Sequence, residues 1–121
     1  MFTPDYERFC SLAQEGNLIP VYREHLADME TPVSAFSRFA QDDYAFLLES
    51  VEGGERWGRY SFIGVHPRSI FTVEDGVGIL RDPADPSRAR TVGQGLSGLK
   101  ELMDEYNPVP LPELPRFYGG A

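Results

Sequence analysis

The sequence predicts an α+β protein in which antiparallel hairpins form a sheet and about three helices pack on it. Two observations lead to this expectation. Strand-like apolar runs flank the pairs Gly53-Gly54 and Asp75-Gly76, and such pairs are typical of β-hairpin turns. Around these hairpins, apolar residues recur at helical spacing in three segments. A chain of 121 residues is long enough for one domain with its own core.

The first half of the chain predicts two helices with a strand between them. A helix opens at Thr3-Pro4 and ends at Gly16-Asn17. Residues 18–26 alternate as a strand, and the missing backbone donor of Pro20 places that strand at a sheet edge or a bulge. A second helix follows the turn at 28–32, with Thr31 as N-cap and Pro32 as its first residue.

The second half predicts a hairpin, a loop, a helix and a connector. Residues 69–74 and 77–81 pair across Asp75-Gly76 in a type I′ turn. Residues 82–90 are polar and contain two prolines, which predicts a mobile loop. Thr91 with Gln94 three residues later resembles a capping box and predicts a third helix. The apolar residues of that helix are Val92, Leu96, Leu99, Met103 and Tyr106.

The last residues predict an extended connector and the beginning of a strand. Residues 107–115 contain four prolines and favour an extended conformation. Residues 116–118 then resemble a strand that has barely begun when the sequence ends at Ala121. We therefore expect this chain to be the front portion of a larger β-sandwich enzyme, with a sheet edge that another segment covers.

The segment Tyr44–Val51 is the most informative strand, because both of its alternating sets are mostly apolar. Such a pattern predicts a strand that is buried on both faces. Glu49 is then a carboxylate in apolar surroundings, which costs several kcal/mol unless a cationic partner answers it. That partner could be a side chain or a ligand.

The hairpin across Gly53-Gly54 offers candidates for this partner. With a two-residue loop, Glu49 faces Gly58, which leaves open space beside the carboxylate. Arg56 and Tyr60 then lie diagonal to Glu49, and Arg59 lies diagonal to Ser50 on the other face. A one-residue bulge exchanges these faces. The alternative, which the chemistry alone favours, is that Glu49 pairs with one of the two arginines inside the sheet.

The composition excludes several classes of function. The net charge is −8, from 19 acidic and 11 basic residues, and argues against nucleic acids and anionic membranes as partners. The single cysteine, Cys10, fits a reducing compartment. The charged first residues are unlike a signal peptide, and no apolar run approaches the roughly 20 residues of a membrane span. These features predict a cytoplasmic protein.

Familiar catalytic motifs are absent from the sequence. It contains no Gly-rich phosphate loop, CxxC, HExxH or GxSxG pattern. His25 and His66 are isolated from clustered acids, so we expect no metal site. Ser61 has no basic partner that the sequence reveals, and Trp57 is best explained as a core residue. The residues alone do not specify an enzyme.

Several stretches together resemble anthranilate synthase component I, specifically its N-terminal region. They occur in the order of that family and cover nearly the whole chain. They are NLIPVYRE at 17–24, ADMETPVSAF at 27–36, FLLES at 46–50, RYSFIG at 59–64 and PRFYGGA at 115–121.

The resemblance implies a role in making anthranilate from chorismate, with ammonia or the amide of glutamine from a glutamine amidotransferase subunit, component II. It implies a requirement for Mg²⁺ and feedback inhibition by L-tryptophan. The chorismate and Mg²⁺ residues of the family lie in a later portion, so residues 1–121 correspond to the N-terminal regulatory region and none of them is catalytic. The fragment alone is expected to be inactive.

The tryptophan site is what the resemblance transfers to this sequence. The Leu-Glu-Ser motif of the family maps to Leu48, Glu49 and Ser50, and a basic residue on the next strand maps to Arg59. A carboxylate and a hydroxyl suit the ammonium of the ligand, and a guanidinium suits its carboxylate. Leu48 and nearby aromatic side chains would then line the indole.

Other readings remain open at the level of the sequence. Aminodeoxychorismate synthase component I has the same architecture and a folate product, although the Leu-Glu-Ser spelling favours anthranilate synthase. A non-catalytic module that recruits a partner strand at an open sheet edge belongs to a different class. A fragment that folds alone is expected to form homodimers through its open strand edges.

Overall fold

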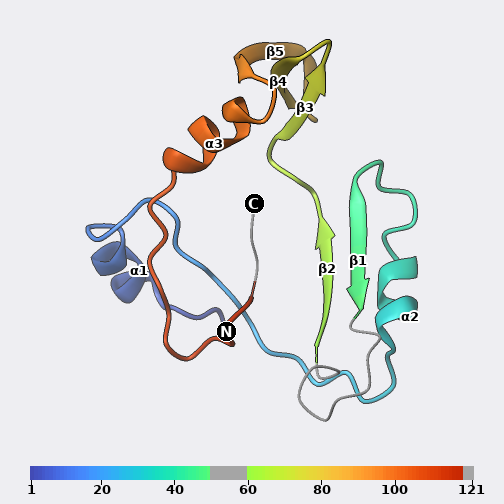
Figure 1. Cartoon of the computed structure of the whole chain (residues 1–121). Coiled ribbons are helices and arrows are strands. Elements are labelled where there is room, and N and C mark those ends of the chain that lie inside the picture. Colours follow the sequence, from blue (N-terminus) through green and yellow to red (C-terminus); the bar gives the residue numbers. More distant parts are fainter. Residues whose placement is uncertain (50–59, 119–121) are drawn as a thin grey trace. The chain divides into compact units, whose positions relative to one another are not determined.

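The computed structural model describes residues 1–49 and 60–118 (Figure 1). The chain divides into two compact units. One unit is discontinuous and comprises Met1–His25 and Ile70–Ala121, and the other is the intervening segment Leu26–Ser69. The described elements are helices and antiparallel strands, so the α+β class is confirmed.

The discontinuous unit contains a three-stranded antiparallel sheet in the order β3-β4-β5. The strands are β3 (Ile70–Glu74), β4 (Val77–Asp82) and β5 (Asp85–Gln94). Helix α3 (Ser97–Asp104) packs on β4 and β5. The buried hydrophobic core of the described residues lies in this unit and consists of Val92, Leu102, Val109 and Leu111.

The β3–β4 hairpin confirms the predicted type I′ turn. Asp75 has φ 50° and Gly76 has φ 78°, so both central residues have the left-handed backbone that this turn requires. The Arg81 guanidinium donates to Glu74 Oε1 at 2.6 Å across the hairpin. Because hydrogen bonds from Arg81 and Thr72 favour the charged form, the pKa of Glu74 is lowered from its ordinary value.

The segment after this hairpin differs from the prediction. Residues 82–90 do not form a loop, because β5 pairs with β4 along most of this stretch. Thr91 and Gln94 lie on β5, so the predicted capping box is wrong. Gly93 and Gly95, with φ 60° and 52°, turn the chain out of the strand, and α3 begins only at Ser97.

The buried side chain of α3 also differs from the expected set. Leu102, which the predicted apolar stripe omits, is buried against the sheet, while Leu96, Leu99 and Met103 are exposed. The glycine at position 98 explains this orientation. A Cβ at Gly98 would lie 1.8 Å from the Val92 carbonyl oxygen, so the helix backbone sits directly on β5 at this point.

The N-terminal segment folds back on the residues that follow α3. Helix α1 (Tyr6–Leu12) begins after Asp5, whose carboxylate accepts from Arg8 N at 2.8 Å, so the predicted start at Thr3-Pro4 is too early. The predicted strand at 18–26 is wrong, since only isolated bridges join Tyr22 to Thr3 and Leu18 to Pro108. A proline within this stretch removes a ladder donor and interrupts pairing.

Hydrogen bonds between two asparagines fix this long-range contact. Asn107 N donates to Asn17 Oδ1 at 2.6 Å, and Asn17 Nδ2 donates to the Glu105 carbonyl at 2.8 Å. The Asn107 amide donates in turn to the Glu15 carbonyl at 3.2 Å. The extended connector predicted at 107–115 is confirmed and supplies two core side chains, whereas residues 116–118 form no strand.

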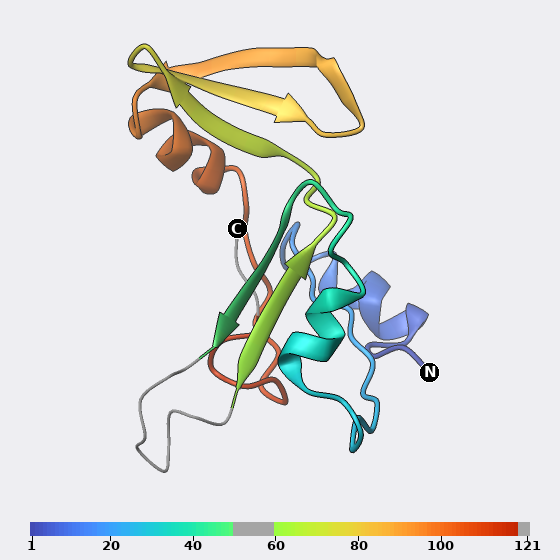
Figure 2. The ribbon, with the colours of Figure 1, turned by 90° about the vertical axis from the view of Figure 1, so that its right-hand side faces the viewer.

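The second unit, Leu26–Ser69, contains helix α2 (Pro32–Ser37) beside strands β1 (Ala45–Glu49) and β2 (Ser61–Val65) (Figure 2). Thr31 caps α2 as predicted, and Pro32 is its first residue. Thr31 Oγ1 accepts from Ser34 N at 3.0 Å, while Ser34 Oγ accepts from Thr31 N at 2.9 Å. This reciprocal capping box stabilises a helix of only six residues.

Candidate functional site

The candidate site lies on the β1–β2 hairpin of the second unit. The two strands pair antiparallel, with Phe46 opposite Gly64, Leu48 opposite Phe62 and Glu49 opposite Ser61. The register expected from a two-residue loop, with Glu49 opposite Gly58, is therefore wrong. Gly64 helps to fix the observed register, because a Cβ there would lie 2.1 Å from the Phe46 ring.

The two faces of this hairpin have different surroundings. Ala45, Leu47, Ile63 and Val65 share one face and are all half-buried. Helix α2 contacts both strands, and its Ala35 and Phe36, with Phe39 just after its end, are also half-buried, so α2 covers this face. Figures 1 and 2 show α2 running beside the two strands.

The opposite face carries aromatic side chains, several of which are partly exposed. Phe46 and Leu48 are 53% and 55% exposed, and Tyr60 beside them is 50% exposed. The rings of Tyr60 and Phe62 stack with their centroids 6.4 Å apart. We call Phe46, Leu48, Tyr60 and Phe62 the aromatic face. The expectation that this strand is buried on both sides is wrong, since its second apolar set reaches solvent.

The predicted site residues fall at the end of β1. Leu48 lies on the aromatic face, and Glu49 lies on the other face, because successive side chains of a strand alternate. Glu49 is exposed, so the expectation of a buried carboxylate is wrong. Among the described residues, no cation forms an ion pair with it. Ser50 and Arg59 lie outside the described residues.

The other end of the hairpin holds His66, which follows the last residue of β2 and makes contacts that the sequence did not reveal. His66 has φ 52°, and its Nδ1 lies 3.8 Å from Asp42 Oδ2. The Phe39 ring meets the imidazole edge-on with centroids 6.4 Å apart. The contact joins the end of β2 to the segment after α2, and the predicted alternation of the strand gave no sign of it.

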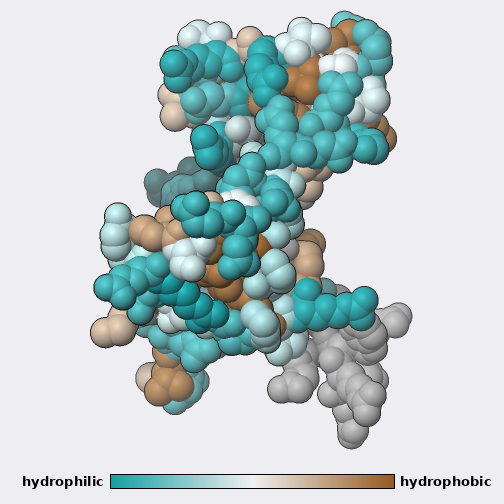
Figure 3. All heavy atoms as spheres, turned by 90° about the vertical axis from the view of Figure 1, so that its left-hand side faces the viewer, coloured by the Kyte–Doolittle hydropathy of each residue, from teal (hydrophilic) through white to brown (hydrophobic). Residues whose placement is uncertain are grey.

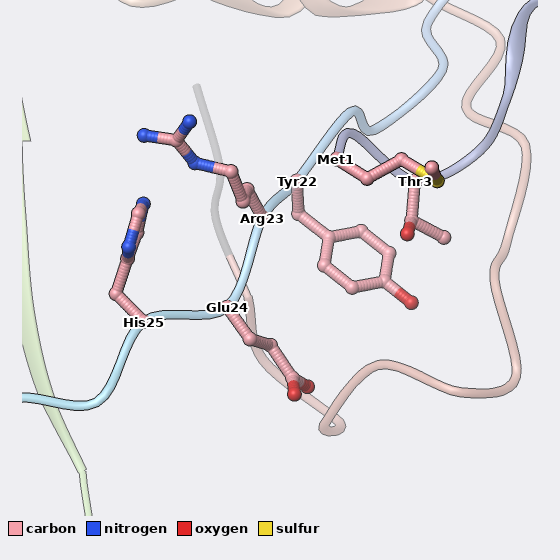
Figure 4. A pocket seen from close by; sticks show the side chains of 6 residues that line it. All are labelled: Met1, Thr3, Tyr22, Arg23, Glu24 and His25. Carbon is pink, nitrogen blue, oxygen red and sulfur yellow. The ribbon is translucent and has the colours of Figure 1, made fainter.

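The discontinuous unit has a separate shallow pocket (Figure 4). Its lining residues are Met1, Thr3, Tyr22, Arg23, Glu24 and His25. Arg23 and His25 point to one side of this extended segment, and Glu24 points away from them. The Arg23 guanidinium also lies 5.4 Å from the centroid of the Phe2 ring, within cation–π range. All of the charged lining side chains are exposed to water.

No group of three or more His, Cys, Asp or Glu side chains within residues 1–49 and 60–118 is arranged to hold a metal ion. Within the same ranges, no helix has the length and apolar composition of a bilayer span.

Several known proteins that are similar to this chain share one name. The chain is 42% identical over all 121 of its residues to anthranilate synthase component 1 of Acetivibrio thermocellus, and this match spans 24% of that protein. It is 42% identical over 99% of its length to the Synechocystis protein of the same name, again 24% of that protein. The protein of this name from Aquifex aeolicus is 36% identical over 94% of the chain.

No family model matches the chain. No solved structure matches it either. The chain spans about a quarter of the length of the curated relatives that it matches, and the matched part is their N-terminal region. Their identity over the full length of this chain supports the resemblance carried by the NLIPVYRE, FLLES and RYSFIG runs. The chain is therefore similar over its whole length to the N-terminal region of proteins named anthranilate synthase component 1.

Proposed function

We propose that residues 1–121 act as the N-terminal regulatory region of an anthranilate synthase component 1 enzyme. The observation that carries this proposal is the identity of 42% over the whole chain to a protein of that name. The enzyme would be a lyase of tryptophan biosynthesis that converts chorismate and glutamine or ammonia to anthranilate. Its Mg²⁺ and chorismate residues would lie outside this chain, and component II would supply ammonia from glutamine.

We further propose that the β1–β2 hairpin contributes to a site for L-tryptophan. Leu48, Glu49, Ser50 and Arg59 are the residues that match the effector motif of the family. Leu48 presents an apolar side chain beside Phe62, which suits an indole ring. Glu49 points to the other face of β1, so its accessible carboxylate would meet the α-ammonium of the same ligand only at the end of the strand.

The exposure of Glu49 sets a condition on this site. A carboxylate in water attracts an ammonium ion by only about 1 kcal/mol at 4 Å, because the high dielectric and dissolved salt weaken the interaction. A selective site therefore requires further polypeptide that excludes water around Glu49. This chain alone should bind tryptophan weakly, and submillimolar binding by the isolated chain in a calorimeter would contradict a shared site.

Inhibition then follows from linkage. Tryptophan can lower activity only if it binds the less active conformation more tightly than the active one. A typical coupling free energy of 1–3 kcal/mol corresponds to an affinity ratio of roughly 5 to 150 between the two conformations. Residues that touch the ligand in one conformation only would set this ratio.

A hybrid enzyme tests the proposal. The chain is joined in place of the matched region of the Acetivibrio thermocellus protein, and anthranilate formation is followed by fluorescence with increasing L-tryptophan. We expect formation of anthranilate and inhibition by tryptophan. Ser50→Phe should raise the tryptophan concentration for half-inhibition at least about tenfold, with inhibition measured relative to the uninhibited rate of the same variant.

Ser11→Phe on α1 is the matched control, because it introduces the same side chain at an exposed serine of the other unit. Its half-inhibitory concentration should equal that of the hybrid. Unchanged inhibition in Ser50→Phe would reject the site assignment, and a hybrid without anthranilate synthesis would reject the proposed function.

A further inference from the structure

Hydrophilic side chains are common on the surface of this chain, so exposed charge alone does not identify a binding site. On the side of the molecule in Figure 3, hydrophilic side chains surround smaller hydrophobic patches. Most described basic side chains have an acidic partner, with a carboxylate oxygen at 3.8 Å or less. These are Arg8, Arg38, His66, Arg81, Arg88, Arg90 and Lys100. The basic side chains that have no such partner among the described residues are Arg23, His25, Arg68 and Arg116.

Arg23 and His25 differ from the other two because they are neighbours. Both side chains point to one side of the same extended segment, whereas Glu24 between them points away (Figure 4). Arg88 and Arg90 have the same spacing in the sequence, but each of them pairs with a carboxylate oxygen at 3.8 Å. In a chain with a net charge of −8, two adjacent basic side chains without an acidic partner are the exception. They offer hydrogen-bond donors that the described chain does not use.

The backbone beside this pair is held in place. Thr3 and Tyr22 form an antiparallel bridge, in which the amide of each residue donates to the carbonyl of the other at 2.8 Å. The Arg23 guanidinium lies 5.4 Å from the centroid of the Phe2 ring, and this cation–π contact favours one position of a long side chain. A side chain that is already ordered loses less conformational entropy when a ligand binds. The donors are therefore partly preorganised.

The pocket that these residues line sets the size and polarity of a ligand. Its volume of about 460 Å³ lies within the range of roughly 300–1,000 Å³ that is typical of small-molecule sites. Besides the charged side chains, its lining includes the hydroxyl groups of Thr3 and Tyr22, so the ligand is hydrophilic. A guanidinium donates two parallel hydrogen bonds to a carboxylate or a phosphate. An imidazole has at least one N–H donor in either protonation state.

We propose that Arg23 and His25 bind the carboxylate or phosphate group of a small hydrophilic molecule. The Arg23 guanidinium donates two hydrogen bonds to this group, and the His25 imidazole donates a third. Glu24 also lines the pocket, and its negative charge disfavours a ligand with many negative charges. The proposal is independent of the proposed function, because it uses only residues of this chain that lie in one of its two units.

A nuclear magnetic resonance titration of the ¹⁵N-labelled chain tests this site. Sodium phosphate replaces sodium chloride at constant ionic strength and neutral pH. The amide signals of residues 22–25 should shift to a plateau with a dissociation constant on the order of 1 mM, because exposed ion pairs are weakened by water and salt. The amide of Ser11 on α1, in the same unit, is the internal control and should not shift.

Sodium acetate is the second titrant and distinguishes the two kinds of ligand. Tighter binding of phosphate would support the site and identify a phosphate group as its ligand. Tighter binding of acetate would support the site and identify a carboxylate. Signals of residues 22–25 that show no saturable shift with either anion would overturn the proposal.

A matched pair of arginine variants separates this site from the overall charge of the chain. Arg23→Gln should raise the dissociation constant of the tighter anion at least about fivefold, because the guanidinium is lost. Arg88→Gln is the control, since Arg88 is also exposed, lies in the same unit and has a basic neighbour two residues away, but pairs with Asp85. It removes the same charge and should change the dissociation constant by less than about 1.5-fold. Equal weakening in the two variants would reject a specific site.

The two neighbours of Arg23 in the pocket provide predictions of opposite sign. Glu24→Gln removes a negative charge from the lining and should tighten anion binding about twofold. His25→Ala removes the imidazole donor and should weaken binding at least about twofold. Both side chains are exposed, so neither substitution removes packing from the core. Weaker binding by Glu24→Gln, or unchanged binding by His25→Ala, would contradict the proposed arrangement.

Discussion

Gly98 lies in the first turn of α3, and replacing it with alanine has two opposing effects on stability. The gain in helix propensity is smaller than the cost of a steric clash. Alanine in place of glycine within a helix gains about 1 kcal/mol in helix propensity. The new Cβ, however, would lie 1.8 Å from the Val92 carbonyl oxygen and 2.8 Å from its carbonyl carbon. Non-bonded heavy atoms separate to about 3.5 Å or more, so α3 must move roughly 1.5 Å away from β5.

That displacement acts on the core as well as on the helix. Val92 on β5 and Leu102 on α3 are both buried where the helix packs on the strand. Fully burying such a side chain stabilises the fold by about 1.5–3 kcal/mol. Overpacking of this kind typically costs 1–3 kcal/mol, and here the atom that is struck belongs to backbone and cannot rotate away. We expect a net loss of about 2 kcal/mol in the free energy of unfolding.

Urea denaturation followed by circular dichroism measures this loss as a lower midpoint at an unchanged slope. Gly76→Ala is the matched control, because a Cβ at position 76 would meet no atom within 4 Å and the φ of 78° imposes only backbone strain. Its cost should be about 1 kcal/mol. A Gly98→Ala protein as stable as the parent would refute the close contact between α3 and β5.

Three further predictions concern single side chains. Leu111→Ala should lower the free energy of unfolding by about 2–5 kcal/mol in a thermal melt, since Leu111 is only 3% exposed. Thr31→Ala should cost about 1 kcal/mol and speed amide exchange in α2, because it removes the N-cap. The pKa of Glu74 is lowered by its hydrogen bonds to Arg81 and Thr72. The pairing of Glu74 with Arg81 therefore stabilises the fold at pH values above the ordinary glutamate pKa, and this stabilisation is lost as the pH falls through the lowered pKa. Arg81→Gln should raise the Glu74 midpoint in an NMR titration.

Local chemistry was sufficient to predict some elements of the fold. The Asp75-Gly76 turn and the Thr31 cap follow from residues whose backbone preferences are decided within four positions of the chain. The family resemblance likewise rested on short contiguous runs. These features required no knowledge of which distant segments meet.

Features set by distant contacts were predicted poorly. Residues 82–90 are polar and contain two prolines, yet residues 85–90 belong to the ten-residue strand β5, which pairs with β4. Thr91 and Gln94 have the spacing of a capping box, but both lie on β5, and the left-handed Gly95 follows the strand before α3 begins. In both segments, pairing with β4 determines that the residues form a strand. This pairing cannot be read from the few residues on either side of each segment.

The candidate site shows the same limit. The two apolar sets of residues 44–51 predicted burial, but periodicity identifies which side chains share a face and not whether anything covers that face. Glu49 is exposed in this chain, although the pattern predicted that it would be buried. The register also depends on contacts such as the Phe46 ring over Gly64, which the Gly53-Gly54 signal could not reveal.

The paired asparagines at positions 17 and 107 have a consequence for biosynthesis. The ribosome makes the N-terminal helix early, but the amide groups that secure the segment behind it belong to residues synthesised some ninety positions later. The intervening unit emerges in the meantime and is free to form first. A pause in translation before residue 107 would therefore leave the N-terminal segment without these hydrogen bonds. The segment would stay accessible to proteases until Asn17 and Asn107 form their contact.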